Sequence, residues 1–121
     1  MVKQHRGKII NIASILSFFG SGLVPSYSTS KGALVQLIKS MAIELAPFNI
    51  RVNAIAPGYF ETGMTAPVKS TPLYQEVITR TPAGRWGSAD ECAGAAIFLA
   101  SRASDFVTGT TVVVDGGYAI R

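Results

Sequence analysis

Tyr27 and Lys31 are the two residues in this sequence whose types and spacing best suit acid/base chemistry. They stand four positions apart in a segment of helical periodicity, so both side chains project from one helix face. A free phenol loses its proton near pH ~10, but a neighbouring ammonium group and the positive end of a helix favour its anion. The pair could therefore exchange a proton with an alcohol or carbonyl oxygen.

Ser14 offers a hydroxyl that could reach the same oxygen. It ends the apolar run 8–13, which predicts a buried parallel strand. From there it could donate a hydrogen bond as negative charge develops on the reacting oxygen. Tyr and Lys four apart are usually an ordinary exposed helix pair. The serine at a strand end and the small residues around Tyr27 favour a site where a flat ligand can lie.

The elements that would position these residues alternate along the chain. Apolar strands are predicted at 8–13, 51–56 and 110–114, and helices at 26–46, 73–79 and about 88–101. Pro47 closes the first helix, and Ser88 and Glu91 form a capping box that opens the last one. Strands and helices in this order predict an α/β fold with a parallel sheet covered on both faces. Ligands of such folds gather at the carboxyl ends of the strands.

Four motifs follow one another over essentially the whole chain. They are INIAS at 10–14, YSTSKGA at 27–33, IRVNAIAPG at 50–58 and VVVDGG at 112–117. Together they resemble the C-terminal half of a short-chain dehydrogenase/reductase. The resemblance implies that residues 1–121 form the C-terminal catalytic part of one Rossmann-type domain, with three parallel strands and flanking helices. The N-terminal dinucleotide-binding half of that domain is absent from this sequence.

The resemblance also assigns roles at the reacting centre. It implies that Ser14 positions the substrate oxygen and that Tyr27 is the proton donor or acceptor. Lys31 would bind the nicotinamide ribose and lower the pKa of the tyrosine. The cofactor would be NAD or NADP, and the substrate a small alcohol or ketone.

The segment that begins at Pro57 and Gly58 would, by the same resemblance, cover the nicotinamide. Phe60 by its backbone and Thr62 by its hydroxyl match the positions that hold the carboxamide. Because the glycine-rich phosphate loop of the family is not in this sequence, we expect residues 1–121 alone to bind cofactor weakly or not at all and to turn over poorly.

Two further stretches refine the resemblance. PGYFETGM at 57–64 and RTPAGRWG at 80–87 look closest to gluconate 5-dehydrogenases, and 3-oxoacyl-carrier-protein reductases and other polyol dehydrogenases share much of both. A sugar acid would suit the basic balance of the chain and Arg85. Intact family members are expected to be homo-tetramers or dimers. The rival interpretation is an inert truncated product, or one that only associates with intact relatives through helix 26–46.

Composition excludes several other classes. The net charge of +4 comes from scattered basic residues, which argues against a nucleic-acid surface. No apolar run approaches the ~20 residues of a membrane span. Cys92 is the only cysteine, which fits a reducing cytoplasm, and with His5 alone it cannot build a metal site. Asp115 is expected to cap the sheet end, whereas Trp86 could be a packing anchor or line a pocket.

Overall fold

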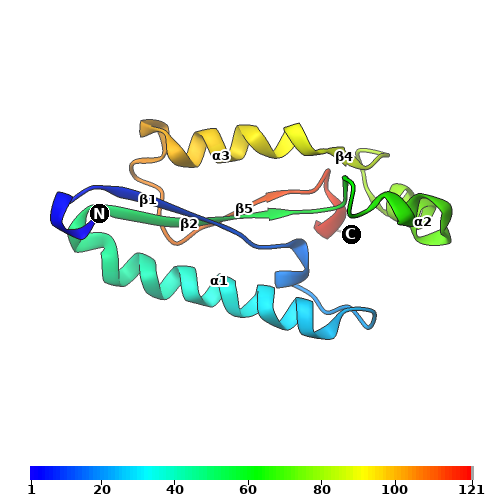
Figure 1. Ribbon diagram of the computed structural model, residues 1–121, viewed down its shortest axis with the longest axis horizontal. Coiled ribbons are helices and arrows are strands. Elements are labelled where there is room, and N and C mark those ends of the chain that lie inside the picture. Colours follow the sequence, from blue (N-terminus) through cyan, green and yellow to red (C-terminus); the bar gives the residue numbers. More distant parts are fainter. Residues whose placement is uncertain (121) are drawn as a thin grey trace.

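A parallel sheet of three strands forms the middle layer of the protein (Figure 1). The computed structural model describes residues 1–120. The strands are β1 (Gly7–Ile12), β2 (Ile50–Pro57) and β5 (Thr111–Val114), in the order β1-β2-β5. Gly7 lies opposite Ile50 in the register of β1 with β2, and Ala54 lies opposite Thr111 in that of β2 with β5. The predicted α/β fold and its three parallel strands are confirmed.

Helices cover both faces of this sheet (Figure 1). α1 (Pro25–Leu45) packs on β2 from one side, and α3 (Ala93–Ala100) contacts β1 and β2 from the other. Pro25 occupies the first turn of α1, where a missing N–H costs nothing. At the other end the 3₁₀ turn Ala46–Phe48 contains Pro47 and stops the helix. The prediction of a helix over 26–46 is confirmed to within one residue.

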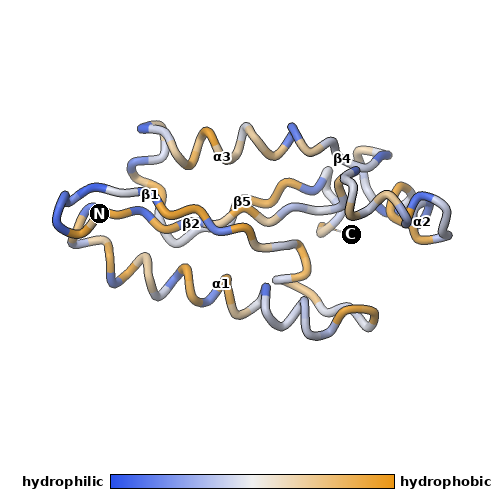
Figure 2. The backbone as a smooth tube through the Cα atoms, in the orientation of Figure 1, coloured by the Kyte–Doolittle hydropathy of each residue, from blue (hydrophilic) through white to orange (hydrophobic). Residues whose placement is uncertain are grey.

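The central strand β2 carries the core, and apolar residues run along the strands in Figure 2. Val52 and Ala54 are fully buried, and they pack with Ile38 and Ala42 of α1. Removing such side chains from water is the main force that holds the helix on the sheet. Asn53 is buried as well, where its side chain donates to the Val107 carbonyl and accepts from the Thr110 amide.

β1 is the edge of the sheet, so the prediction of a buried strand there is only partly right. Among residues 1–120 it pairs with β2 alone, and its residues are partly buried or exposed. Ile12 is 54% exposed. A strand needs neighbours on both sides to be buried, and here β2 is the only one.

A smaller unit lies beyond the carboxyl ends of β2 and β5. It contains α2 (Pro72–Arg80) and a two-stranded parallel sheet of β3 (Phe60–Glu61) and β4 (Gly87–Ser88). The sequence predicts the helix but misses the strands, because two residues are too few to show a period. The capping box at Ser88 is present, although a 3₁₀ turn (Ala89–Cys92) precedes α3 where a continuous α-helix was expected.

Candidate active site

Ser14 lies just beyond β1 and begins the 3₁₀ helix Ile15–Ser17. Its backbone is extended and its side chain is 7% exposed. Ser14 Oγ accepts a hydrogen bond from the amide of Leu16 at 3.1 Å. No residue of the described chain accepts the hydroxyl hydrogen of Ser14, so that hydrogen is available to an oxygen placed beside it.

Lys31 joins the start of α1 to the end of β1. Its Nζ donates a hydrogen bond to the carbonyl of Ile12 at 2.6 Å and lies 5.6 Å from the centre of the Tyr27 ring. The expected neighbourhood of Tyr27 and Lys31 on one helix face is therefore confirmed. Because Ile12 precedes Ser14 by two residues, the same ammonium also lies close to the strand end that carries the serine.

Ser17 provides a second link, and the sequence analysis missed it. Its hydroxyl donates to the carbonyl of Lys31 at 2.8 Å and accepts from the amide of Ser14 at 3.3 Å. One side chain thus joins the backbone at Ser14 to the backbone at Lys31. The signal was present in the sequence as a second serine three residues after Ser14, the spacing of a helix cap.

Three of the other hydroxyls near Tyr27 are occupied within α1 itself. Ser28 and Thr29 donate to the carbonyl of Pro25 at 3.0 and 2.9 Å, and Ser30 donates to that of Tyr27 at 2.7 Å. Tyr27 is 45% exposed, and its hydroxyl makes no hydrogen bond within residues 1–120. The phenol of Tyr27 is therefore available to a ligand at this helix start.

The carboxyl end of β2 is drawn tightly against β5. The amide of Gly58 donates to the carbonyl of Val114 at 2.9 Å. A Cβ at Gly58 would lie 2.6 Å from Cβ and 2.8 Å from Cα of Asp115, so only glycine fits between the two strands. This close approach fixes where the chain after Pro57 leaves the sheet.

The chain that leaves the sheet turns back on itself at Thr65, a residue the sequence analysis did not single out. Thr65 Oγ1 donates to the carbonyl of Phe60 at 2.7 Å and accepts from the amide of Thr62 at 2.9 Å. The hydroxyls of Thr62 and Thr65 lie 3.2 Å apart. The predicted cofactor-contacting residues Phe60 and Thr62 are thus held in one compact turn, and their contacts with a cofactor stay a prediction.

An aromatic cluster joins that turn to the loop after Ser14. The ring of Tyr59 lies 5.2 Å from that of Trp86 and 5.0 Å from that of Tyr118, both edge-on. Phe19 stacks on Tyr118 at 6.2 Å, and Ile15 packs in the same cluster. Aromatic contacts of this kind add to the stability gained from burial alone.

Tyr59 is distinct from Tyr27 in its chemistry. Burial, together with the nearby hydroxyl of Tyr118, raises the pKa of Tyr59 to about 12. At neutral pH it therefore stays a neutral phenol and is unsuited to exchange protons with a substrate. Of these two tyrosines, the exposed Tyr27 is the acid/base candidate.

The structure defines the role of Trp86, which the sequence left open, and tests the capping role expected of Asp115. Trp86 is 5% exposed, and its Nε1 donates to the carbonyl of Tyr74, whose ring stacks on it at 5.1 Å. It is a packing anchor. The Asp115 carboxylate accepts from the amides of Gly117 and Ala119, both at 2.8 Å, so its expected capping role is confirmed.

Arg85 does not offer the free charge expected for binding a sugar acid. Its guanidinium donates two hydrogen bonds to the carboxylate of Glu91, at 2.7 and 2.8 Å. Glu91 also accepts from the amide of Ser88, and these bonds lower its pKa to about 2. The positive charge of Arg85 is therefore already matched by a carboxylate that is ionised at neutral pH.

Three further observations limit the chemistry. Cys92 is partly buried, and that burial raises the pKa of its thiol. Within residues 1–120, no three His, Cys, Asp or Glu side chains are close enough together to hold a metal ion. No helix in that part of the chain is long and apolar enough to cross a membrane.

Comparison with known proteins agrees with this geometry. The family profile described as enoyl-(acyl carrier protein) reductase matches residues 1–119. The chain belongs to the short-chain dehydrogenase/reductase family. The resemblance inferred from the four motifs is thereby confirmed.

Relatives within the family carry names from sugar-acid metabolism. The chain is 54% identical to 2-dehydro-3-deoxy-D-gluconate 5-dehydrogenase of Bacillus subtilis, over 100% of this chain and 48% of that protein. It is 49% identical to 5-keto-D-gluconate 5-reductase of Escherichia coli, over 99% and 48%. The chain spans about half the length of the curated relatives it matches.

The fold is likewise that of solved family members. A gluconate 5-dehydrogenase from Burkholderia cenocepacia, crystallised with NADP and tartrate, superimposes with a TM-score of 0.95 at 45% identity. The match covers 99% of this chain and 48% of that one. The finer likeness to gluconate 5-dehydrogenases that the sequence suggested thus has support in both sequence and structure.

Proposed function

We propose that this chain supplies the acid/base part of an NADP- or NAD-dependent oxidoreductase that interconverts the CH–OH and carbonyl forms of gluconate-type sugar acids. The observation that carries the proposal is the position of Lys31. Its ammonium group lies beside the ring of Tyr27 and is bonded to the carbonyl of Ile12, next to the strand end that holds Ser14.

The role of each side chain in the reaction follows from its chemistry. Tyr27, whose exposed hydroxyl has no hydrogen-bond partner within residues 1–120, gives a proton to the carbonyl oxygen in reduction and removes it in oxidation. The ammonium of Lys31 stabilises negative charge on the phenol oxygen at that moment. Ser14 donates its free hydroxyl hydrogen to the same substrate oxygen. The nicotinamide cofactor, when bound, supplies or accepts the hydride.

The residues present fit such a cofactor. One bond of Lys31 Nζ is used for Ile12, which leaves two ammonium hydrogens for a ribose hydroxyl. Across the site, the turn 57–65 is held by β5 and by Thr65, so its backbone is already ordered. A preorganised wall of this kind lowers the entropic cost of binding.

Several facts support a sugar-acid substrate. Relatives that match the whole of this chain are named for 2-dehydro-3-deoxygluconate and for 5-ketogluconate, and a solved relative holds NADP and the dicarboxylate tartrate. The two names differ in the substrate but share a carboxylate and a secondary alcohol. Because Arg85 is paired with Glu91, it is not part of this proposal.

A chimera tests the proposal. Residues 1–121 replace the matching segment of the Bacillus subtilis relative. NADPH or NADH oxidation is followed with 5-ketogluconate, and NADP⁺ or NAD⁺ reduction is followed with 2-dehydro-3-deoxygluconate. We expect turnover with at least one of them, and a fall in kcat of about 10²- to 10⁴-fold on Tyr27→Phe. Tyr59→Phe is the matched control and should keep most of the activity. A folded chimera that is inactive, or whose activity survives Tyr27→Phe, would contradict the proposal.

We further propose that this protein is cytoplasmic and that it forms a homo-oligomer. The single cysteine supports the first point. For the second, Leu37 and Ile43 of α1 are 51% and 79% exposed, and apolar side chains on a helix surface favour association. The same helix would serve the alternative function, in which this chain associates with longer relatives.

A further inference from the structure

A cavity of about 510 Å³, open to solvent, is lined by the amino ends of β1 and β2 and by the chain after α3. This volume is in the range of small-molecule sites. The cavity lies at the amino ends of the strands, whereas Ser14 follows the carboxyl end of β1, roughly 23 Å away by the rise of the eight-residue β2. Its lining consists of nine residues: Arg6, Gly7, Lys8, Asn49, Arg51, Ala100, Ser101, Arg102 and Asp105.

Basic residues outnumber acidic residues in the lining of this cavity. Four of the nine residues are lysine or arginine, and Asp105 is the one acidic residue among them. Asp105 pairs with Lys8, whose Nζ lies 2.9 Å from its Oδ1. Arg6, Arg51 and Arg102 form no ion pair within residues 1–120.

Arg51 is held in place by neutral groups. Its Nε donates to the backbone carbonyl of Asp105 at 2.6 Å, and its Nη2 donates to Oδ1 of Asn49 at 3.0 Å. These bonds fix the guanidinium without neutralising it. Its charge therefore remains available to a ligand.

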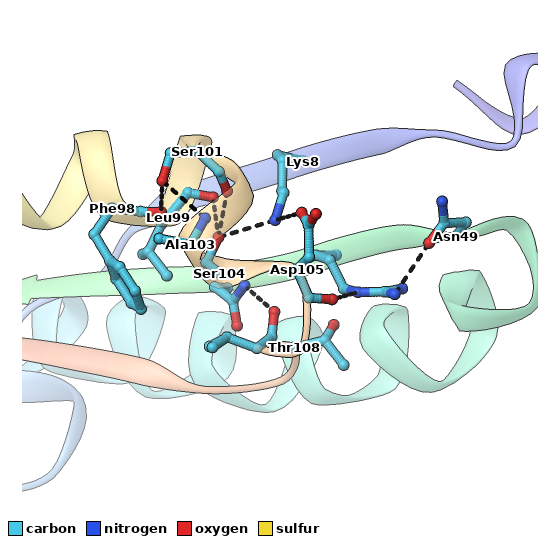
Figure 3. Close-up of polar contacts among 12 residues, drawn as sticks. Lys8, Asn49, Phe98, Leu99, Ser101, Ala103, Ser104, Asp105 and Thr108 are labelled. Carbon is cyan, nitrogen blue, oxygen red and sulfur yellow. Dashed lines mark hydrogen bonds and ion pairs between the residues drawn. The ribbon is translucent and has the colours of Figure 1, made fainter.

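The wall after α3 is rigid as well (Figure 3). Ser104 is fully buried, where it donates to the carbonyl of Leu99 at 2.9 Å and accepts from Lys8 at 2.9 Å. Ser101 caps the following turn by accepting from the amide of Ala103. A site whose walls are already ordered loses little entropy when it binds.

Arg6 and Arg102 complete the basic lining. Both are exposed, and neither forms an ion pair with any of residues 1–120. The pKa of Asp105 lies below its usual value, first because of the hydrogen bond from Lys8, with smaller contributions from Arg102 and Arg51. Several cations thus act together on the one carboxylate present.

We propose that this cavity binds a small oxyanion with two or more negative charges, a phosphate ester or a polycarboxylate, through Arg6, Arg51 and Arg102. The planar fork of arginine matches the oxygens of both classes. Asp105 offsets part of the field, so a single negative charge gains less than two. The site is separate from the oxidoreductase function proposed above, because none of its residues approaches Ser14 or Tyr27.

Titration calorimetry on the full chain tests this at low ionic strength with pyrophosphate, citrate and acetate. We expect pyrophosphate or citrate to bind at least about tenfold more tightly than acetate, and the affinity to fall with added NaCl. Arg6→Gln and Arg102→Gln should each weaken binding by about five- to tenfold, the effect of one lost charge-assisted contact. Lys39→Gln removes an equal charge from the exposed surface of α1 and should change little.

The outcomes separate the possibilities. Binding of pyrophosphate alone assigns the site to phosphate esters, and binding of citrate alone assigns it to polycarboxylates. Amide resonances of Gly7 and Ser101 should move during the titration of the unmodified chain, which tests the location without any mutation. Absence of binding, equal binding of acetate, or equal losses in Arg102→Gln and Lys39→Gln would each overturn the proposal.

Discussion

At the scale of single residues, the candidate active site is held by bonds to the main chain. Ser17 joins the backbone at Ser14 to that at Lys31, and Lys31 itself is bonded to the carbonyl of Ile12. The atoms proposed to act on the substrate take no part in these bonds: the hydroxyl hydrogens of Ser14 and Tyr27 have no acceptor among residues 1–120. These hydroxyl groups can therefore bind a substrate without breaking a hydrogen bond of the fold.

Glu91 gives a prediction at the same scale. Its pKa is lowered from the usual 4.5 to about 2 by Arg85 and the Ser88 amide. A carboxyl with a lowered pKa stabilises the fold fully above about pH 4.5, and this contribution is lost as the pH falls toward about 2. In urea unfolding at about pH 6 and about pH 3, Glu91→Gln should lose less stability on acidification than the unmodified chain.

Glu44→Gln is the matched control, because Glu44 is exposed on α1 and has no ion pair within residues 1–120. It should show the full acid sensitivity of the unmodified chain. Equal sensitivity of the Glu91 and Glu44 variants would contradict the assignment of the low pKa to the Arg85 contact.

At the scale of elements, the junction of β2 with β5 decides where the turn after Pro57 lies. Gly58 passes so close to Asp115 that no side chain fits, and Asp115 in turn caps the amides of Gly117 and Ala119. The ends of both strands are therefore fixed together. The turn over Phe60–Thr65 begins from this fixed point.

Gly58→Ala should therefore be costly. Its Cβ would come within 2.8 Å of the Asp115 backbone, so the two strand ends must separate. We expect a loss of about 1–3 kcal/mol in the free energy of unfolding, as for overpacked cores. Gly63→Ala is the control, since nothing lies within 4 Å of its Cβ, and it should change stability by no more than about 0.5 kcal/mol. Similar losses in the two variants, measured by urea unfolding, would refute the argument.

At the scale of the whole molecule, the sheet is asymmetric. β2 is bordered by β1 and β5, covered by α1 and α3, and almost entirely buried. β1 has a partner on one side only among the described residues. Its open edge presents backbone groups to the surroundings, which is a known route to association.

Hydrogen exchange should show this asymmetry residue by residue. The amide of Ala13 donates to the carbonyl of Ile55, and strand period places the amides of Asn11 and Ile9 on the same side. We expect these amides to exchange slowly and those of Ile10 and Ile12 to exchange quickly. Slow exchange at Ile10 and Ile12 in dilute solution would mean that another strand covers the edge.

The sequence alone determined the three parallel strands and the span of α1, and it singled out Ser14, Tyr27 and Lys31 as candidate site residues, because period, capping and motif order are local properties of the chain. Only the tertiary structure decided the state of Arg85, the packing of Trp86 and the role of Thr65. Those depend on contacts that form only in the folded chain. Glu91 pairs with Arg85, for example, and the Tyr74 carbonyl accepts a hydrogen bond from the indole N–H of Trp86. The cavity at the amino ends was beyond sequence reasoning for the same reason: its arginines come from three segments that only the folded sheet brings together.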